Sequence, residues 1–299
     1  MTSARAVSRD DLRALLGRRI GPISNHWGAR EAILYALASG ATQEHIEYVY
    51  EGYGPKLLPT FPIFAAGPLT ASAVSLFPDG ANPVYAGFRY NFYGQVPLEG
   101  ELTSTGEIIG IDFHEASALV WIRMESGVAG RLVMSNLSPL HVKSESGVVQ
   151  IVGAHPRNMV ASALGEPLEP LSTAVDARAT LLYHLLLPIV SAQPSPDAFH
   201  IDPTEARSRG LAGTPLHGAG ITGHLGLLLA AAARRYATGS VVELGGRFVG
   251  PVFPGDTLTL RLWRPKEGSH QWSLQMENGR GEVIIGKAWV KFGAFDATR

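Results

Sequence analysis

The residues best suited to chemistry lie between positions 199 and 224. A short polar loop that contains His200 and Asp202 leads into a Pro-Leu-His-Gly turn at 215–218. A helix of small and apolar residues is expected directly after this turn. The first amides of a helix have no partner inside the helix, and they lie at the positive end of its dipole. We therefore expect an anion, or an oxygen that gains charge during a reaction, to bind at this helix start.

His200 is the first candidate for proton transfer, because its surroundings can bring the pKa of an imidazole close to the working pH. A structural role is the alternative: His200 hydrogen-bonds within its own loop, and Asp202 caps the helix that begins at the next residue. His217, in the turn, is expected to pack and hydrogen-bond rather than to ionise. His184 and His224 are weaker candidates.

Neither a metal nor a nucleotide cofactor is expected. The chain has no cysteine, no His-Glu-x-x-His motif and no clustered carboxylates. Gly218-x-Gly220-x-x-Gly223 has the spacing of a dinucleotide-binding fingerprint, and Glu243 follows 20 residues later. That fingerprint comes directly after a strand, however, and residues 210–217 hold two glycines and a proline. We interpret the glycines as small residues that let a sheet pack closely on the helix.

Composition narrows the function classes further. The chain has 299 residues, is 45% hydrophobic and carries a formal net charge of −1, so it can bury a large core. Without a long basic run it is not expected to bind nucleic acid. The polar N-terminal stretch and the short apolar run 225–233 predict no membrane partner, and the absence of cysteine is compatible with a cytoplasmic location.

The expected elements alternate between helical and extended stretches. Gly67-Pro68 should kink the second apolar helix of the first half. Residues 44–53, rich in aromatic and β-branched side chains, are expected to be extended. The expected helices are 29–40, 61–77, 177–187 and 218–236, and the expected strands are 102–111, 118–124, 130–137, 241–249, 257–264, 271–278 and 283–292.

The second half repeats the order of the first. Pro59-Thr60-Phe61 and Pro215-Leu216-His217 each precede an apolar helix, and each is followed 41 or 40 residues later by a Gly-acidic pair. Arg89 and Arg247 precede those glycines by 11 and 8 residues. One duplicated unit, a helix followed by an antiparallel sheet, explains these spacings. The sequence therefore predicts an α+β chain with units at 1–152 and 176–299, joined by a proline-containing linker at 153–175.

The second half contains His200-Ile201-Asp202-Pro203, then Leu216-His217-Gly218, then the run Arg247–Leu258, and the series ends at Trp263. The first half contains Leu34–Ala41, Val49–Gly52 and Leu58–Phe61. In this order and spacing the second half resembles the MaoC-like, R-specific 2-enoyl-thioester hydratases (hydratase 2) of the hotdog fold, and the first half looks like the degenerate N-terminal hotdog of the two-domain members. The resemblance covers most of residues 25–295.

The resemblance implies a double hotdog that adds water to, or removes it from, an acyl thioester of coenzyme A or an acyl carrier protein. In the family an Asp and a His of one loop are catalytic, and an amide at the start of the second hotdog helix holds the thioester oxygen. His200 matches that His and Gly218 matches that amide. The first half is implied to make room for the acyl chain. Further residues implied to bind substrate are Tyr183, Phe199, Asp202, Leu216, His217, Arg247 and Phe61.

The chain departs from the family in the catalytic loop. The family loop reads Tyr-Arg-Leu-Ser-Gly-Asp-x-Asn-Pro-Leu-His, and Tyr183 matches its start, but the segment before His200 is several residues longer here. Counting back from His200, Ser195 occupies the position of the catalytic Asp, and Asp197 occupies that of the Asn. The usual base is therefore missing unless the longer loop brings Asp197 into its place.

Three functions follow from this departure. The first is a hydro-lyase in which His200 transfers a proton and Asp197 or Ser195 contacts the water. The second is an enzyme with a rebuilt site that catalyses another addition, elimination or cyclisation on a thioester or polyketide-type substrate. The third is a non-catalytic acyl-thioester binder. Hotdog proteins commonly pair their sheets, and two arrangements are open here: the two halves of one chain pair with each other, or two chains form a homodimer.

Overall fold

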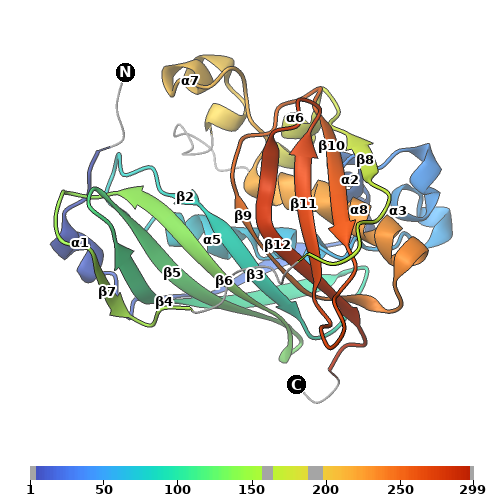
Figure 1. Ribbon diagram of the computed structural model, residues 1–299, viewed down its shortest axis with the longest axis horizontal. Coiled ribbons are helices and arrows are strands. Elements are labelled where there is room, and N and C mark those ends of the chain that lie inside the picture. The colour runs from blue at the N-terminus through green and yellow to red at the C-terminus, as the bar shows by residue number, and fades with distance from the viewer. Residues whose placement is uncertain (1–4, 157–163, 188–197, 297–299) are drawn as a thin grey trace.

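The computed structural model describes residues 5–156, 164–187 and 198–296 (Figure 1). The helices are α1 (Arg9–Arg13), α2 (Ala29–Ala38), α3 (Ile46–Val49), α4 (Phe61–Ala65), α5 (Gly67–Val74), α6 (Ala179–His184), α7 (Pro203–Ser208) and α8 (Gly218–Tyr236), and η1 (Gln43–His45), η2 (Glu51–Tyr53) and η3 (Ala198–His200) are 3₁₀ turns. The strands are β1 (Arg19–Trp27), β2 (Val84–Tyr85), β3 (Gly87–Phe92), β4 (Gly100–Phe113), β5 (Ser117–Val128), β6 (Arg131–Lys143), β7 (Gln150–Gly153), β8 (Leu171–Ala174), β9 (Ser240–Phe248), β10 (Thr257–Trp263), β11 (Trp272–Asn278) and β12 (Val283–Gly293).

The strands form one antiparallel sheet in which the two halves of the chain meet at β3 and β9. The order along the sheet is β1-β4-β5-β6-β3-β9-β12-β11-β10-β8, with β2 beside β6 and β7 beside β4. At the junction Phe88 pairs with Gly246, and Arg89 pairs with Gly245. Figure 1 shows β4–β6 on one side, β9–β12 on the other, and the main helices behind them. Each half therefore supplies its own set of neighbouring strands to one continuous antiparallel sheet.

The second half is built around α8, which has the predicted bounds. The helix begins after His217, whose backbone is extended, and it ends with Arg234 and Arg235 near the negative end of its dipole. Its apolar residues lie in the main core together with the inward-facing residues of β9–β12. The predicted stripe on this helix, Ile221, Leu225, Leu228 and Leu229, is 4% exposed or less.

The first half has a shorter, broken central helix. The chain turns at Ala66, so α4 and α5 are separate helices, and the kink predicted at Gly67-Pro68 is confirmed. The prediction of an extended segment at 44–53 is wrong, because these residues form η1, α3 and η2. Thr42 caps that helical stretch by accepting a hydrogen bond from the Glu44 amide at 3.3 Å, and Tyr48 is buried against the core. Tyr48 therefore serves helix packing rather than a strand.

Helices α2 and α4 of the first half pack directly on α8. A Cβ placed on Gly223 would come within 2.3 Å of the Ser39 Oγ, and one on Gly226 within 2.0 Å of the Thr60 Oγ1. The small residues of α8 therefore allow close packing, as predicted, but their neighbours on this side are helices and not the sheet.

The linker prediction, 153–175, includes residues outside the described ranges. In its described part β7 ends beside β4, His155 contacts Asp112 at 2.9 Å, and β8 pairs with β10.

Within the described parts of the chain no helix has the length and apolar character needed to cross a membrane.

Candidate functional site

His200 lies at the end of η3, where its ring is fixed against the turn that starts α8. Its Nδ1 is 2.7 Å from the carbonyl oxygen of Pro215. A carbonyl oxygen can only accept, so Nδ1 carries the proton and Nε2 is the nitrogen that can take up or release a proton. This is the tautomer that a general base or acid acting through Nε2 needs.

The His200 ring is held between two other rings. The ring centroids of Phe199 and His200 are 3.9 Å apart at 35°, and those of His200 and His217 are 3.8 Å apart at 24°. Two rings whose centroids lie this close to the centroid of one imidazole, one tilted by 35° and one stacked at 24°, must lie on its opposite faces. The guanidinium carbon of Arg209 lies 4.3 Å from the Phe199 centroid and extends this stack toward the surface.

His217 forms the inner end of the stack. It is 7% exposed, and Tyr183 lies beyond it with ring centroids 4.9 Å apart. Among the described residues neither of its ring nitrogens has a hydrogen-bond partner. Burial, with His200 and His184 nearby, holds the pKa of His217 well below its usual range. His217 is therefore a neutral ring at neutral pH, as the sequence predicts, although it packs without the expected hydrogen bond.

The start of α8 presents open amides beside these rings. Within the described parts of the chain no hydrogen bond involves the N–H of Gly218, Ala219 or Gly220, whereas the Ile221 amide donates to the His217 carbonyl. The Leu216 amide donates to the Val252 carbonyl at 2.7 Å and anchors the turn. The helix start can therefore hold an oxygen with negative charge.

The structure brings only some of the sequence-predicted residues together. The residues that lie in or beside the turn before α8 are His200, His217, Gly218, Phe199, Leu216 and Tyr183. Asp202 is exposed and caps α7 by accepting from the Thr204 amide at 2.7 Å, which is the structural role considered for it. Ser195 and Asp197 lie outside the described residues.

Two other predicted residues lie apart from this group. Arg247 is exposed on β9, and because side chains alternate along a strand, its neighbour Phe248 is the residue that points toward α8. A Cβ on Gly218 would be 3.5 Å from the Phe248 ring. Phe61 is fully buried and reaches the group only through Phe64 and Tyr183. Sequence reasoning missed Phe248, although it is the second residue of the matching run 247–258.

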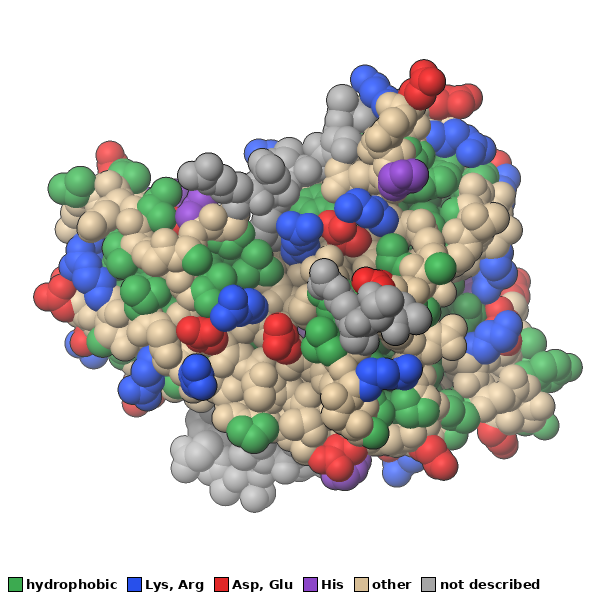
Figure 2. All heavy atoms as spheres, turned by 90° about the horizontal axis from the view of Figure 1, so that it is seen from below, with side chains coloured by type: hydrophobic (Ala, Val, Ile, Leu, Met, Phe, Trp, Pro, Cys, Tyr) green, Lys and Arg blue, Asp and Glu red, His purple; other side chains and the backbone are tan. Residues whose placement is uncertain are grey.

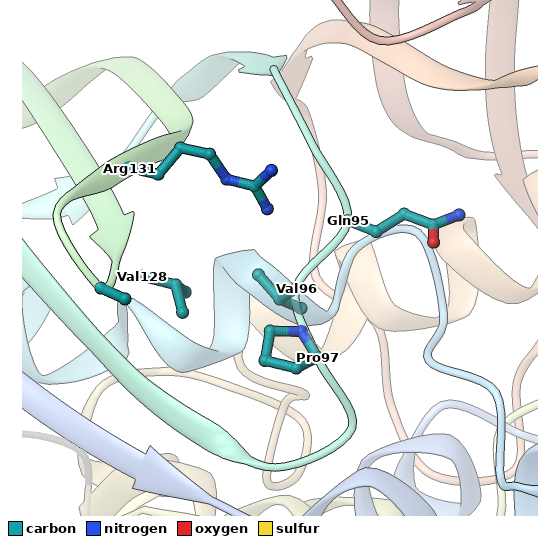
Figure 3. A pocket seen from close by; sticks show the side chains of 6 residues that line it. Gln95, Val96, Pro97, Val128 and Arg131 are labelled. Atoms are coloured by element: carbon teal, nitrogen blue, oxygen red, sulfur yellow. The ribbon is translucent and has the colours of Figure 1, made fainter. Parts of the chain in front are cut away.

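The dinucleotide-like pattern at the start of α8 does not follow a strand. The segment before Gly218 is irregular, and Glu243 is bound by Arg89, Lys291 and Trp289. A separate hollow lies at the β5–β6 turn and is lined by Gln95, Val96, Pro97, Val128, Ala129 and Arg131 (Figure 3). None of the residues around the turn before α8 contributes to that hollow.

Comparison with known proteins finds one family model and a relative of nearly the same length. Residues 26–143 match the model of the MFE-2 hydratase 2 N-terminal domain. Over 297 residues the chain is 25% identical to the 3-hydroxyacyl-thioester dehydratase Y of Mycobacterium tuberculosis, and the match covers 93% of this chain and 97% of that protein. These matches support the resemblance to the MaoC-like hydratase 2 family.

Solved structures of other proteins share this fold. A MaoC-like dehydratase from Phytophthora capsici has a TM-score of 0.74 at 18% identity, and the match covers 95% of this chain and 98% of the other. A protein of Mycobacterium tuberculosis whose structure is described as a double hotdog has a TM-score of 0.61 at 15% identity, with 94% and 96% covered. The predicted double hotdog is thereby confirmed. The open amides of α8 and His200 lie in the second half of the chain.

Proposed function

We propose that the protein hydrates a 2-enoyl thioester to a 3-hydroxyacyl thioester, or catalyses the reverse dehydration. The observation that carries the proposal is the pairing of an Nδ1-protonated His200 with the unpartnered amides at the start of α8. The related Mycobacterium tuberculosis protein is named a 3-hydroxyacyl-thioester dehydratase, which supports the same chemistry here.

Each group has a role in this proposal. The thioester oxygen accepts a hydrogen bond from the Gly218 amide, so that charge developing on it as an enolate is stabilised. Nε2 of His200 exchanges a proton with the substrate. Asp197 or Ser195 contacts the water, and either would replace the Asp that the family uses. Coenzyme A is the proposed carrier, with an acyl carrier protein as the alternative.

A non-catalytic acyl-thioester binder is the second candidate. It is favoured by the side chains that already occupy the space around the His200 ring. Leu216 is 3% exposed, and Phe199 and His217 cover both faces of the imidazole. Such a protein would bind the thioester at α8 without changing it.

The deciding experiment is a hydration assay with crotonyl-CoA and a longer 2-enoyl-CoA, following the loss of enoyl absorbance. We expect turnover by the native protein, loss of turnover in His200→Ala, and no loss in His270→Ala. His270 is the matched control because it is exposed in the turn before β11. Saturable binding without turnover by the native protein would favour the binder, and turnover that survives His200→Ala would contradict the assigned role of His200.

A further inference from the structure

His217 is a second imidazole at the site, and the proposed reaction assigns it no step. It is almost fully buried at the N-cap of a 19-residue helix, yet neither ring nitrogen has a partner among the described residues. An imidazole buried in this way loses its hydrogen bonds to water and gains none in exchange. Its polar atoms therefore do not explain its place, whereas its flat ring, 3.8 Å from His200, does.

We propose that His217 is a positioning residue whose neutral ring forms a flat wall that fixes the plane of the His200 imidazole. The inference rests on the proposed function, because it concerns the residue assigned to proton transfer. The other face of His200 is covered by Phe199, and the Pro215 carbonyl holds Nδ1. The ring contacts on the two faces restrain the plane of the His200 imidazole, and the hydrogen bond to Pro215 restrains its rotation within that plane. Nε2 therefore points in one direction.

The charged and titratable groups around His200 and His217 are consistent with a neutral His217 ring. From η3 and α7 they are His200, Asp202 and Arg209, and the Arg209 guanidinium is also bonded to Glu205 at 3.0 Å. From α6 they are Tyr183 and His184. Asp202 accepts from the Thr204 amide, and Glu205 is paired with Arg209. No carboxylate among the described residues contacts His217, so none of them stabilises a charged ring at that position.

If His217 acts as a flat neutral surface, kcat should depend on the planar shape of side chain 217 and not on its ring nitrogens. His217→Phe retains a planar ring, and His217→Leu retains an apolar side chain of comparable size without the plane. Misplacement of a reacting group by about 1 Å can cost about 100-fold in rate. For crotonyl-CoA hydration we expect His217→Phe to keep kcat within about threefold of the native value. His217→Leu should lose about 10- to 100-fold in kcat with KM changed by less than about threefold.

The orientation of His200 can be measured without turnover. In protein with ¹⁵N-labelled histidine, the ring-nitrogen shifts of His200 should report protonation at Nδ1 in the native chain and in His217→Phe. In His217→Leu they should report a mixture of tautomers. Equal kcat in both variants, or equal loss in both, would overturn the proposal, since the first makes the plane irrelevant and the second makes the nitrogens essential.

The two measurements separate this inference from the proposed function. If the native protein hydrates no enoyl thioester but His200 remains locked as the Nδ1–H tautomer only where residue 217 is planar, the proposed function fails and the positioning role stands. If the native protein turns over and the lock is unchanged in His217→Leu, the positioning role fails. Phenylalanine removes two unpartnered buried nitrogens, so His217→Phe should not lower the thermal midpoint of unfolding.

Discussion

The turn before α8 and the turn before α4 occupy corresponding places in the two halves, and their backbone amides differ. Before α8, the amides of Gly218 and the two residues after it have no partner within the described parts of the chain. Before α4, the Phe61 amide donates to Leu58 and the Ile63 amide to Thr60, while Pro62 between them has no N–H. In the repeat, Pro62 stands where Gly218 stands. The first half therefore lacks the donor that an oxygen with negative charge needs.

The side chains in the two turns differ in the same way. Phe61 takes the place of His217, and its ring packs against Trp27, Tyr35 and Phe64 at centroid distances of 5.3–5.7 Å. His217 instead stacks on a second imidazole that is only partly buried. At these two turns, the first half supplies packing and the second half presents an imidazole pair. Charged side chains of both signs are interspersed on the face that Figure 2 shows, in keeping with the net charge of −1.

The largest effect is expected from giving α8 the proline that α4 has. Gly218 is the first helical residue, where proline is tolerated, and His217 before it is extended at φ −60° and ψ 146°, as a residue before proline must be. Gly218→Pro removes one amide and should lower kcat for enoyl-thioester hydration by about 10²- to 10³-fold. The thermal midpoint should change little.

Gly218→Ala is the control, because it keeps the amide and adds a methyl group at an ordinary contact distance of 3.5 Å from Phe248. Both variants should be assayed with the same thioester. An equal loss of kcat in both would mean that space at residue 218 matters, and that its N–H does not.

In the middle of α8, where the first half packs on it, we expect a residue that makes the free energy of unfolding depend on pH. His224 is fully buried, its Nδ1 donates to the Gly220 carbonyl at 2.9 Å, and burial lowers its pKa to about 4. Between this pKa and about 6.5 the unfolded chain binds a proton that the folded chain does not. The free energy of unfolding therefore falls as the pH falls through this window, by about 3 kcal/mol for this residue.

Urea unfolding at pH 7.5 and pH 5 tests this dependence. His224→Leu should reduce the difference in free energy between the two pH values, and the exposed His270→Leu should leave it unchanged. His217, with its pKa also lowered, acts in the same direction, so part of the slope should persist in His224→Leu. A slope that is identical in the native chain and in His224→Leu would contradict the prediction.

The sequence predicted the fold well because local signals and tertiary structure agree. The glycine-rich start and the apolar stripe of α8 gave its bounds, and strand alternation gave β4–β6 and β9–β12. Residues 44–53 misled the prediction, since a cap at Thr42 and the burial of Tyr48 outweigh their β propensity.

The candidate site was only partly predictable. His200 and Gly218 were found through their spacing in the family pattern, and the structure places both around the turn before α8, while their roles stay predictions. The ring stack was not predicted, because whether Phe199 and His217 cover the same imidazole depends on how η3 folds back onto the turn. The positions of Ser195 and Asp197, outside the described residues, stay predictions.

The smallest effect is expected at the start of α4, where the groups are already satisfied. The Tyr35 hydroxyl is buried and donates to the Thr60 Oγ1 at 3.1 Å, and burial raises the pKa of Tyr35. Tyr35→Phe removes this hydrogen bond and should lower the free energy of unfolding by about 1 kcal/mol with kcat unchanged. Tyr53→Phe is the control, since that side chain is 65% exposed and should change neither quantity. If Tyr35→Phe lowered kcat as strongly as Gly218→Pro, the start of α4 would be part of the reaction site, and the two helix starts could not be divided into one that packs and one that binds.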